Sequence, residues 1–264
     1  MKTEAFAAAK VNLSLHVTGQ RADGYHLLDS LVVFADIGDR LWFDPAPDLQ
    51  IEVSGAFADG VPIDCRNLVW QAAELAGWSG KIHLEKNLPH GAGIGGGSSD
   101  AAAVLRAFGA AEAAVTLGAD VPVCLNPCAQ RMRGIGDVLD PISPLPGMEI
   151  LLINPHVQVP TGPVFAALES KQNKPMPDKL PSFESAHDFC IWLKGQRNDL
   201  EKPARAIAPQ IDMALEALEG AMIARMSGSG ATCFGLYQQG AKDAAKRITQ
   251  AHPDWWVAAG KLLS

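Results

Sequence analysis

Positive charge is scarce in this chain of 264 residues. Its 22 Lys and Arg are outnumbered by 29 Asp and Glu, which gives a net charge of −7 at neutral pH. The basic residues form no cluster and do not alternate with aromatic ones, as a surface that follows a phosphate backbone would require. We therefore expect no nucleic-acid partner. Small anionic substrates stay possible, because a local group of backbone N–H donors can outweigh a diffuse negative charge.

Cysteine is also scarce, and its spacing excludes two kinds of site. The five cysteines are Cys65, Cys124, Cys128, Cys190 and Cys233. They form no CxxC pair, and an odd number in a chain of this length does not suggest a disulfide framework. Cys124 and Cys128 are close in sequence, but no His or second cysteine pair lies nearby at zinc spacing. We expect reduced thiols and no protein-bound metal.

Long apolar runs are missing. No segment reaches the ~18 apolar residues of a membrane span, and Lys10 and Asn12 interrupt the Ala-rich start before a signal-type run develops. The sequence therefore predicts no membrane partner and a cytoplasmic protein. With 48% hydrophobic and 19% charged residues, the chain has material for one large or two modest cores, and its length favours two domains. Nothing in the sequence indicates the oligomeric state.

The first half of the chain is rich in predicted strands. Val11–Val17 alternates apolar and polar residues, as a strand with one buried face does, and Gly19–Gly24 predicts a turn. Further strands are expected at Ser30–Phe34, Arg40–Phe43, Leu49–Val53 and Lys81–Glu85, with a helix at Asn67–Ala76. Asp100–Ala114 is almost continuously apolar and predicts a buried helix, for which Ser98, Ser99 and Asp100 are capping candidates.

The second half predicts a β-α-β-β-α-β series, the order found in ferredoxin-like domains. Its expected elements are a strand Glu149–Asn154, a short helix near Pro163–Leu168, a helix Pro203–Leu218, strands Met222–Met226 and Thr232–Tyr237, a helix Ala241–His252 and a strand Trp255–Ala259. We therefore expect an α/β protein of the α+β two-layer type. Its two domains would be residues 1–146 and 147–264, the second ferredoxin-like.

A glycine-rich loop joins the strand that ends at Glu85 to the apolar helix. Glycine at five of seven positions, 91, 93, 95, 96 and 97, lets the backbone adopt positive φ and approach a ligand without a Cβ in the way. Since a helix follows at once, its free N–H groups and the positive end of its dipole face the loop. This arrangement indicates a phosphate-binding loop, and Ser98 and Ser99 add hydroxyl donors.

Three interpretations of this loop compete. The Walker pattern GxxxxGK[ST] is excluded, because Ser98 follows Gly97 where a Lys is required. The dinucleotide pattern GxGxxG matches Gly91, Gly93 and Gly96 but is weak by itself. Five residues separate the preceding strand from Gly91, whereas in a dinucleotide fold the first glycine ends the strand directly. A flexible turn without a ligand is the third interpretation.

The loop resembles the nucleotide loop of the galactokinase, homoserine kinase, mevalonate kinase and phosphomevalonate kinase (GHMP) superfamily. The resemblance lies in the pattern Pro89-x3-Gly93-Ile94-Gly95-Gly96-Gly97-Ser98-Ser99-x-Ala101. Three further segments support it, in the order of the family and over the whole chain: Ala9–Leu13 with Gly19–His26, Leu117–Pro122, and Ser227–Ala231. The resemblance implies that residues 1–146 are a GHMP-kinase-like ATP-binding domain. It also implies two helices between Ser99 and Asp120. Only 20 residues lie between these positions, so one of the two helices must be short or missing.

The same segments resemble one branch of this superfamily in particular. Kinases of that branch phosphorylate the 2-hydroxyl of cytidine diphosphate methylerythritol in the non-mevalonate isoprenoid pathway, so the resemblance implies this small-molecule substrate. Two alternatives stay open: another kinase of the superfamily, acting on mevalonate or homoserine, and a non-catalytic nucleotide-binding relative. The pair Tyr25–His26 favours the first branch, because the other substrates have no base to stack on.

The resemblance assigns the catalytic roles to Lys10 and Asp120. Asp120 would take the proton of the acceptor hydroxyl, and Lys10 would keep the carboxylate ionised and stabilise the attacking oxygen. Asp120 could instead cap the turn before Pro122, and Lys10 could be a solvated lysine on an edge strand. ATP would be bound by Lys86, Pro89, His90, Gly91, Ala92, Gly93, Ile94, Gly95, Gly96, Gly97, Ser98 and Ser99, with Mg²⁺ carried in on the nucleotide. Lys86 could equally be merely solvated.

The resemblance also assigns the substrate contacts. Tyr25 and Phe165 would stack on the two faces of the cytosine, and His26 would form a hydrogen bond with the base. Asn12 and Thr161 would contact the erythritol or phosphate part. Simple packing in a helix core is an equal alternative for Phe165.

Overall fold

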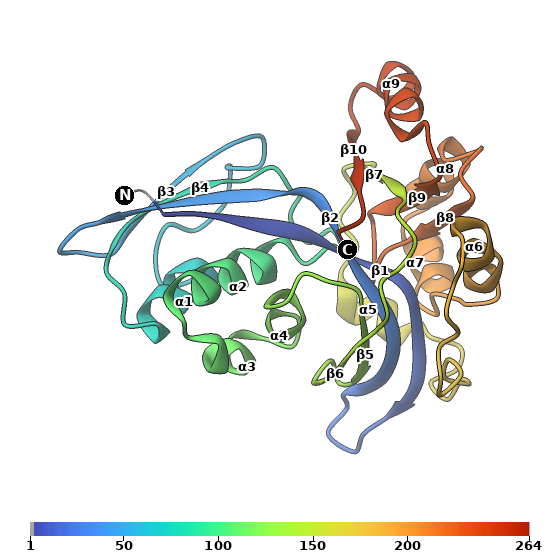
Figure 1. Cartoon of the computed structure of the whole chain (residues 1–264), viewed down its shortest axis with the longest axis horizontal. Coiled ribbons are helices and arrows are strands. Elements are labelled where there is room, and N and C mark those ends of the chain that lie inside the picture. Colours follow the sequence, from blue (N-terminus) through green and yellow to red (C-terminus); the bar gives the residue numbers. More distant parts are fainter. Residues whose placement is uncertain (1–2, 264) are drawn as a thin grey trace. The chain divides into compact units, whose positions relative to one another are not determined.

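The computed structural model describes residues 3–263, which form two compact units. The first unit holds the chain up to Lys10 together with Gly38–His90 and Gly95–Pro127, and the second holds Val11–Ile37, Gly91–Ile94 and Cys128–Ser264. Strands β1 (Thr3–Gln20) and β2 (His26–Pro45) contribute to both units, so the units interleave along the chain (Figure 1). The expected division after residue 146 does not follow these units and stays a prediction.

In the first unit, helices cover one face of a sheet (Figure 1). The end of β2 pairs antiparallel with β4 (Gly80–Glu85), and β3 (Gln50–Ser54) lies parallel to β4. Alternate residues of β4, Ile82 and Leu84, are buried, as are Val69 and Ala72 of helix α1 (Leu68–Leu75). Helix α2 (Gly96–Phe108) packs beside α1. Burial of apolar side chains of this kind is the main force that holds the first unit together.

Two expectations for this unit need correction. The predicted strands Ser30–Phe34 and Arg40–Phe43 are parts of one strand, β2. Helix α2 begins at Gly96, and its N-cap residue is Gly95 in the left-handed region, so Ser98, Ser99 and Asp100 lie inside the helix and do not cap it. The helix ends at Phe108, where Gly109 has φ 70°, earlier than the predicted Ala114.

The segment after α2 forms only short helical turns, as the small number of residues predicts. They are a 3₁₀ turn at Ala111–Ala113, α3 (Ala114–Leu117) and α4 (Val121–Cys124). Helix α3 has four residues. One of the two expected helices is therefore reduced to a single turn.

The second unit contains the predicted ferredoxin-like domain. Its four strands, β7 (Glu149–Asn154), β8 (Ile223–Met226), β9 (Cys233–Tyr237) and β10 (Trp256–Lys261), are antiparallel in the order β10-β7-β9-β8. Its helices are α5 (Thr161–Ala166), α6 (Ala186–Lys194), α7 (Glu201–Ile207), α8 (Gln210–Ala217) and α9 (Ala241–Ala251). The predicted helix Pro203–Leu218 is two helices, because Pro209 has no N–H to continue the hydrogen bonds of the first.

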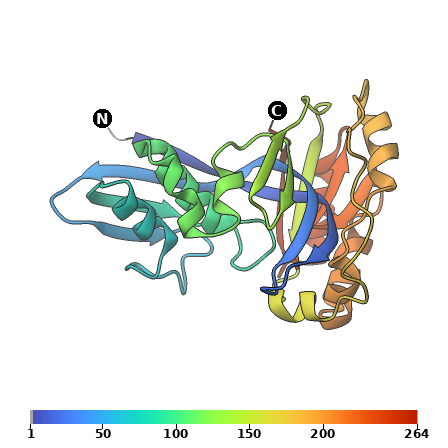
Figure 2. The same ribbon diagram turned by 90° about the horizontal axis from the view of Figure 1, so that it is seen from below.

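A hairpin of the second unit was not expected from the sequence. Strands β5 (Gln130–Gly134) and β6 (Val138–Pro141) form it, and β5 pairs antiparallel with Leu28–Val32 of β2 (Figure 2). The sequence of β5, Gln-Arg-Met-Arg-Gly, lacks apolar alternation. Its Arg131 is nevertheless buried, because both oxygens of Asp29 accept hydrogen bonds from the guanidinium at 2.8 Å.

Candidate active site

Lys10 and Asp120 form an ion pair in the first unit. Lys10 lies on β1 and is 4% exposed, and its Nζ is 3.0 Å from Oδ1 of Asp120, whose side chain is 43% exposed. Asp120 precedes α4 but forms no side-chain cap there. The alternatives of a capping carboxylate and a solvated lysine are therefore wrong. The pair combines a buried cation with an accessible carboxylate, which suits proton transfer to and from a ligand.

Buried contacts around this pair fix the two segments that carry it. Arg106 of α2 donates to the carbonyl oxygen of Cys124, at the end of α4, at 2.6 Å and to that of Phe6 on β1 at 2.9 Å. Burial raises the pKa of the Cys124 thiol to about 12, so this side chain is neutral. Arg106 thus ties β1 to the helical turn that follows Asp120.

The N-terminus of α2 lies next to the same pair. A Cβ on Gly95 would lie 3.3 Å from Cβ of Lys10, and Gly95 has φ 65°. The hydroxyl of Ser99 donates to the carbonyl oxygen of Ala8 at 2.7 Å, and the N–H of Ser99 donates to the carbonyl of Gly95 at 2.8 Å. The N–H groups at the start of the helix, before Ser99, have no partner within it. Free N–H groups at a helix N-terminus suit an anion, and the predicted binding of ATP phosphates by this loop stays a prediction.

The other loop residues contribute through the backbone or by anchoring. Ala92 and Ile94 are buried in the second unit, while Gly91 is exposed. Gly93 has φ 74°, and a Cβ on it would lie 2.4 Å from the carbonyl oxygen of Ser227. Only glycine fits there. In the first unit Pro89 is buried, and the exposed ring of His90 lies edge-on to Phe57.

Lys86 is buried in the first unit, at 4% exposure, and is not a solvated lysine. Its Nζ lies between Asp39 on β2 and Asp100 on α2, at 2.6 Å from Oδ2 of Asp100 and hydrogen-bonded to Oδ2 of Asp39. Sequence reasoning missed both carboxylates. Asp100 was proposed only as a cap, and a lone aspartate within a strand carries no signal. The predicted contact between Lys86 and an ATP phosphate stays a prediction.

In the second unit Asn12 is held by two serines. Its backbone N–H donates to Oγ of Ser227 at 3.0 Å, and its Nδ2 donates to Oγ of Ser30 at 2.8 Å. Ser227 in turn donates to the carbonyl of Gly93 at 2.9 Å. The remaining Oδ1 of Asn12 is buried without a partner. A buried acceptor of this kind is costly unless a ligand donates to it.

The predicted aromatic residues lie at the start of β2 and on α5. His26 and Phe165 stack on each other, with ring centroids 4.5 Å apart and an interplanar angle of 24°. Tyr25 is 59% exposed and is not part of this stack, and its stacking with Phe165 on the two faces of the cytosine stays a prediction. Burial, assisted by Lys171, lowers the pKa of His26, and its Nε2 is buried without a partner.

Thr161, at the start of α5, and Ser229 share a hydrogen bond between their hydroxyl oxygens at 2.9 Å. Both lie in the second unit, and Thr161 is exposed. The Ser227–Ala231 segment thereby contacts Thr161 through Ser229 and Asn12 through Ser227. Three of the segments that the sequence singled out are thus brought together in one unit.

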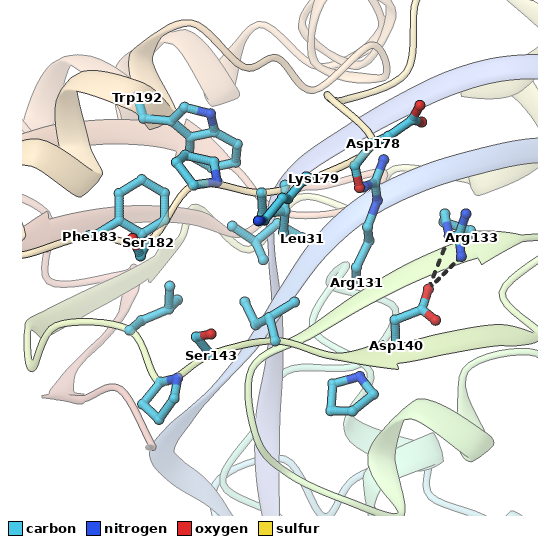
Figure 3. A pocket seen from close by; sticks show the side chains of 16 residues that line it. Leu31, Arg131, Arg133, Asp140, Ser143, Asp178, Lys179, Ser182, Phe183 and Trp192 are labelled. Carbon is cyan, nitrogen blue, oxygen red and sulfur yellow. Dashed lines mark hydrogen bonds and ion pairs between the residues drawn. The ribbon is translucent and has the colours of Figure 1, made fainter.

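A cavity of about 430 Å³ also opens in the second unit (Figure 3). Its wall contains none of the predicted site residues. Arg133 and Asp140 pair with each other at its rim, and Phe183 and Trp192 lie opposite them (Figure 3). Between residues 3 and 263, no group of three or more His, Cys, Asp and Glu side chains could hold a metal ion. No helix in that range is long and apolar enough to cross a membrane.

Comparison with known proteins defines the class to which this fold and site belong. The family model described as GHMP kinases N terminal domain matches residues 67–127, and the model described as GHMP kinases C terminal matches residues 184–254. A homoserine kinase from Cytophaga hutchinsonii shares the fold, with a TM-score of 0.60 at 17% identity over 98% of this chain and 94% of its own. The class is that of the GHMP kinases, which are phosphotransferases.

More similar relatives narrow the class. A 4-diphosphocytidyl-2-C-methyl-D-erythritol kinase from Dinoroseobacter shibae is 57% identical over 96% of this chain and 92% of its own. One from Ruegeria pomeroyi is 52% identical over the full length of both chains. A crystal structure of 4-(cytidine 5'-diphospho)-2C-methyl-D-erythritol kinase aligns with a TM-score of 0.79 at 34% identity, covering 99% of this chain and 100% of the other. The chain belongs to the 4-diphosphocytidyl-2-C-methyl-D-erythritol kinase family, as the sequence motifs indicate.

Proposed function

We propose that this protein transfers the γ-phosphoryl group of ATP to the 2-hydroxyl of 4-diphosphocytidyl-2-C-methyl-D-erythritol. The observation that carries the proposal is the Lys10–Asp120 pair beside the N-terminus of α2, where a Cβ on Gly95 would contact Lys10. A carboxylate that would act as the base and a cation therefore lie next to the helix end that would bind phosphate. Relatives that are 52% and 57% identical carry the name of this kinase.

The N-terminus of α2 would bind the ATP phosphates. The backbone N–H groups of Gly96, Gly97 and Ser98 point out of the first turn, where the helix dipole favours negative charge. Ser98 is half-buried, so its hydroxyl can add a contact, whereas the buried hydroxyl of Ser99 is engaged with Ala8. Ser99 therefore contributes by fixing the helix to β1.

Asp120 would accept the proton of the acceptor hydroxyl. Phosphoryl transfer proceeds through a loose transition state, so the protein mainly positions the nucleophile and offsets charge. Lys10, 3.0 Å from the carboxylate, would stabilise negative charge on the attacking oxygen. A base positioned in this way contributes roughly 10²–10⁴ to the rate.

Mg²⁺ would reach this site on the nucleotide. It is a hard cation that is usually held by phosphate oxygens and water with one or two protein oxygens. Among residues 3–263 no group of three or more His, Cys, Asp and Glu side chains could hold it, so phosphate oxygens and water would be its main ligands. When bound, the ion would neutralise part of the negative charge of the phosphates.

The cytidine part of the substrate would be recognised in the second unit. Phe165 offers a ring face for stacking, and the unpartnered Nε2 of His26 offers a hydrogen bond to the base. Tyr25, being exposed, is free to close on the other face of the base. The unpartnered Oδ1 of Asn12 would accept a hydrogen bond from the erythritol part, and Thr161 would contact it or the diphosphate.

An ADP-release assay tests the proposal. The purified chain is offered 4-diphosphocytidyl-2-C-methyl-D-erythritol, mevalonate and homoserine in parallel, each with ATP and Mg²⁺. We expect turnover with the cytidine compound and none with the other two. Turnover with mevalonate or homoserine alone would reassign the substrate, and ATP binding without turnover on any of the three would make the chain a non-catalytic relative.

A further inference from the structure

Three charged side chains meet beneath the N-terminus of α2. Lys86 follows β4, Asp39 lies on β2, and Asp100 lies on α2, and each is at most 4% exposed. The ammonium donates to Oδ2 of both carboxylates, at 2.6 Å in the case of Asp100. We call these three residues the Lys86 cluster. All of them belong to the first unit.

The cluster connects the chain before the glycine loop to the helix after it. Oδ1 of Asp39 accepts the backbone N–H groups of Asn87 at 2.5 Å and Leu88 at 2.9 Å. A Cβ on Gly96, the first residue of α2, would lie 3.6 Å from Nζ of Lys86 and 3.6 Å from Cβ of Leu88. The helix therefore begins directly on the cluster, with no room for a solvent layer between them.

The charge of the cluster depends on one proton. With both carboxylates ionised the cluster carries −1, and with one protonated it is neutral. Oδ1 of Asp100 is buried without a hydrogen-bond partner, which is far less costly for a neutral acid than for a carboxylate. Burial, the largest cause, and the charge of Asp39 raise the pKa of Asp100 to about 8, although Lys86 opposes them. At pH 7 the proton is therefore held.

The other ionisable groups on the elements around Asp100 are exposed, paired or buried in neutral form. Glu74 is the one ionisable residue of α1, which packs on α2, and it is exposed. On β1, Lys10 is occupied by Asp120, and on α4 the pKa of the buried Cys124 is raised to about 12. After β4 and on β2 the groups facing Asp100 are Lys86 and Asp39 themselves. Asp100 and Asp39 raise the pKa of Lys86 above its ordinary value against the effect of its burial.

We propose that the Lys86 cluster positions the phosphate-binding end of α2, and that loss of its single proton sets an alkaline limit on ATP binding. This inference rests on the proposed function, since it concerns the same helix end. Above the limit an uncompensated negative charge lies beneath the helix N-terminus and repels the phosphates. In this role Lys86, Asp39 and Asp100 are positioning residues that act through the backbone of α2 and need no contact with ATP.

The test is ATP binding, with Mg²⁺ and without acceptor, measured by titration calorimetry at pH 7.5 and pH 9.5. Both values lie above the pKa of about 6 of a phosphate group, so the ligand itself changes little. For the wild-type chain we expect the Kd to rise by about 3- to 10-fold, the scale of one charge acting through a partly solvated medium. Asp100→Asn cannot lose the proton, and its Kd is expected to be the same at both pH values.

Asp140→Asn is the matched control, because Asp140 forms an exposed ion pair with Arg133 in the second unit, and it should keep the wild-type rise. A flat wild-type profile, or an Asp100→Asn profile as steep as that of the wild type, would overturn the inference. If Asp100→Asn does not fold, the change of the wild-type Kd between pH 7.5 and pH 9.5 still tests the inference. Wild-type turnover at pH 7.5 is measured alongside: turnover with a flat profile overturns the inference alone, whereas absence of ATP binding overturns the proposed function as well.

Discussion

The two lysine–carboxylate clusters of the first unit differ in whether a ligand can reach them. Lys10 pairs with Asp120, whose side chain is 43% exposed, whereas Lys86 lies between Asp39 at 0% and Asp100 at 3%. An exposed carboxylate can exchange a proton with a substrate. A buried one can act only on the backbone and charges around it. Burial of the acidic partner, more than the residue types, separates the proposed catalytic pair from the proposed positioning cluster.

Replacing each lysine by methionine should give the largest difference between the two clusters. Lys10→Met leaves Asp120 partly solvated, so the chain should fold normally and lose at least about 10² in kcat. Lys86→Met leaves the buried carboxylate of Asp39 without its cation, which should cost about 3–5 kcal/mol of unfolding free energy. Urea denaturation and kcat of both variants provide the measurement. Equal losses of stability in the two variants would remove the distinction.

The backbone contacts of Asp39 give the next largest expected effect. Asp39→Ala leaves the N–H groups of Asn87 and Leu88 without their buried acceptor, and we expect a loss of about 2–4 kcal/mol. Asp64→Ala is the control, because Asp64 pairs with Arg66 at the surface and its loss should not change the urea midpoint measurably. A similar midpoint for both variants would show that Asp39 does not hold this segment.

A substitution of Phe165 tests binding of the cytidine substrate separately from phosphoryl transfer. Phe165→Leu removes the ring that stacks on His26, and loss of base stacking should raise the KM for the cytidine substrate by about 5- to 100-fold, with the KM for ATP unchanged. Phe183→Leu is the control, since Phe183 packs against Phe189 elsewhere in the same unit. Equal effects of the two changes would favour simple core packing for Phe165.

The last expected effect is the pH dependence of stability due to Asp100. Its pKa of about 8 in the folded chain lies above the ~3.9 of an unfolded aspartate. Between these values the folded chain holds a proton that the unfolded chain has lost, so this group lowers the unfolding free energy as pH rises. The stability of Asp100→Asn relative to wild type should therefore increase from pH 5 to pH 8, as urea midpoints at both values would show. An unchanged difference would mean that Asp100 is ionised throughout.

Much of the fold could be predicted because its local signals are strong. The ferredoxin-like order followed from apolar runs separated by clear turns, and Glu149–Asn154 was predicted to the residue. The hairpin β5–β6 could not be found in this way, because burial of Arg131 depends on Asp29, 102 positions away. The polar residues around Asp36 led to the prediction of two strands, whereas the structure has one continuous strand, β2.

The same difference between local and long-range signals decided which site residues could be predicted. The glycine loop could be recognised from the sequence, because positive φ and a close approach to Ser227 require glycine at position 93. Lys10 and Asp120 were found through resemblance, as no local pattern connects residues so far apart. Asp39 was missed for the same physical reason: its partners, Lys86 and the N–H groups of Asn87 and Leu88, lie more than 40 positions along the chain.

The most direct test of the central claim is turnover of the Asp120→Asn variant with 4-diphosphocytidyl-2-C-methyl-D-erythritol. Asparagine keeps the size of the side chain but cannot accept the proton. ADP release should fall by at least about 10², while calorimetry should show ATP binding close to that of the wild type. A variant that releases ADP at nearly the wild-type rate would contradict the assignment of Asp120 as the base.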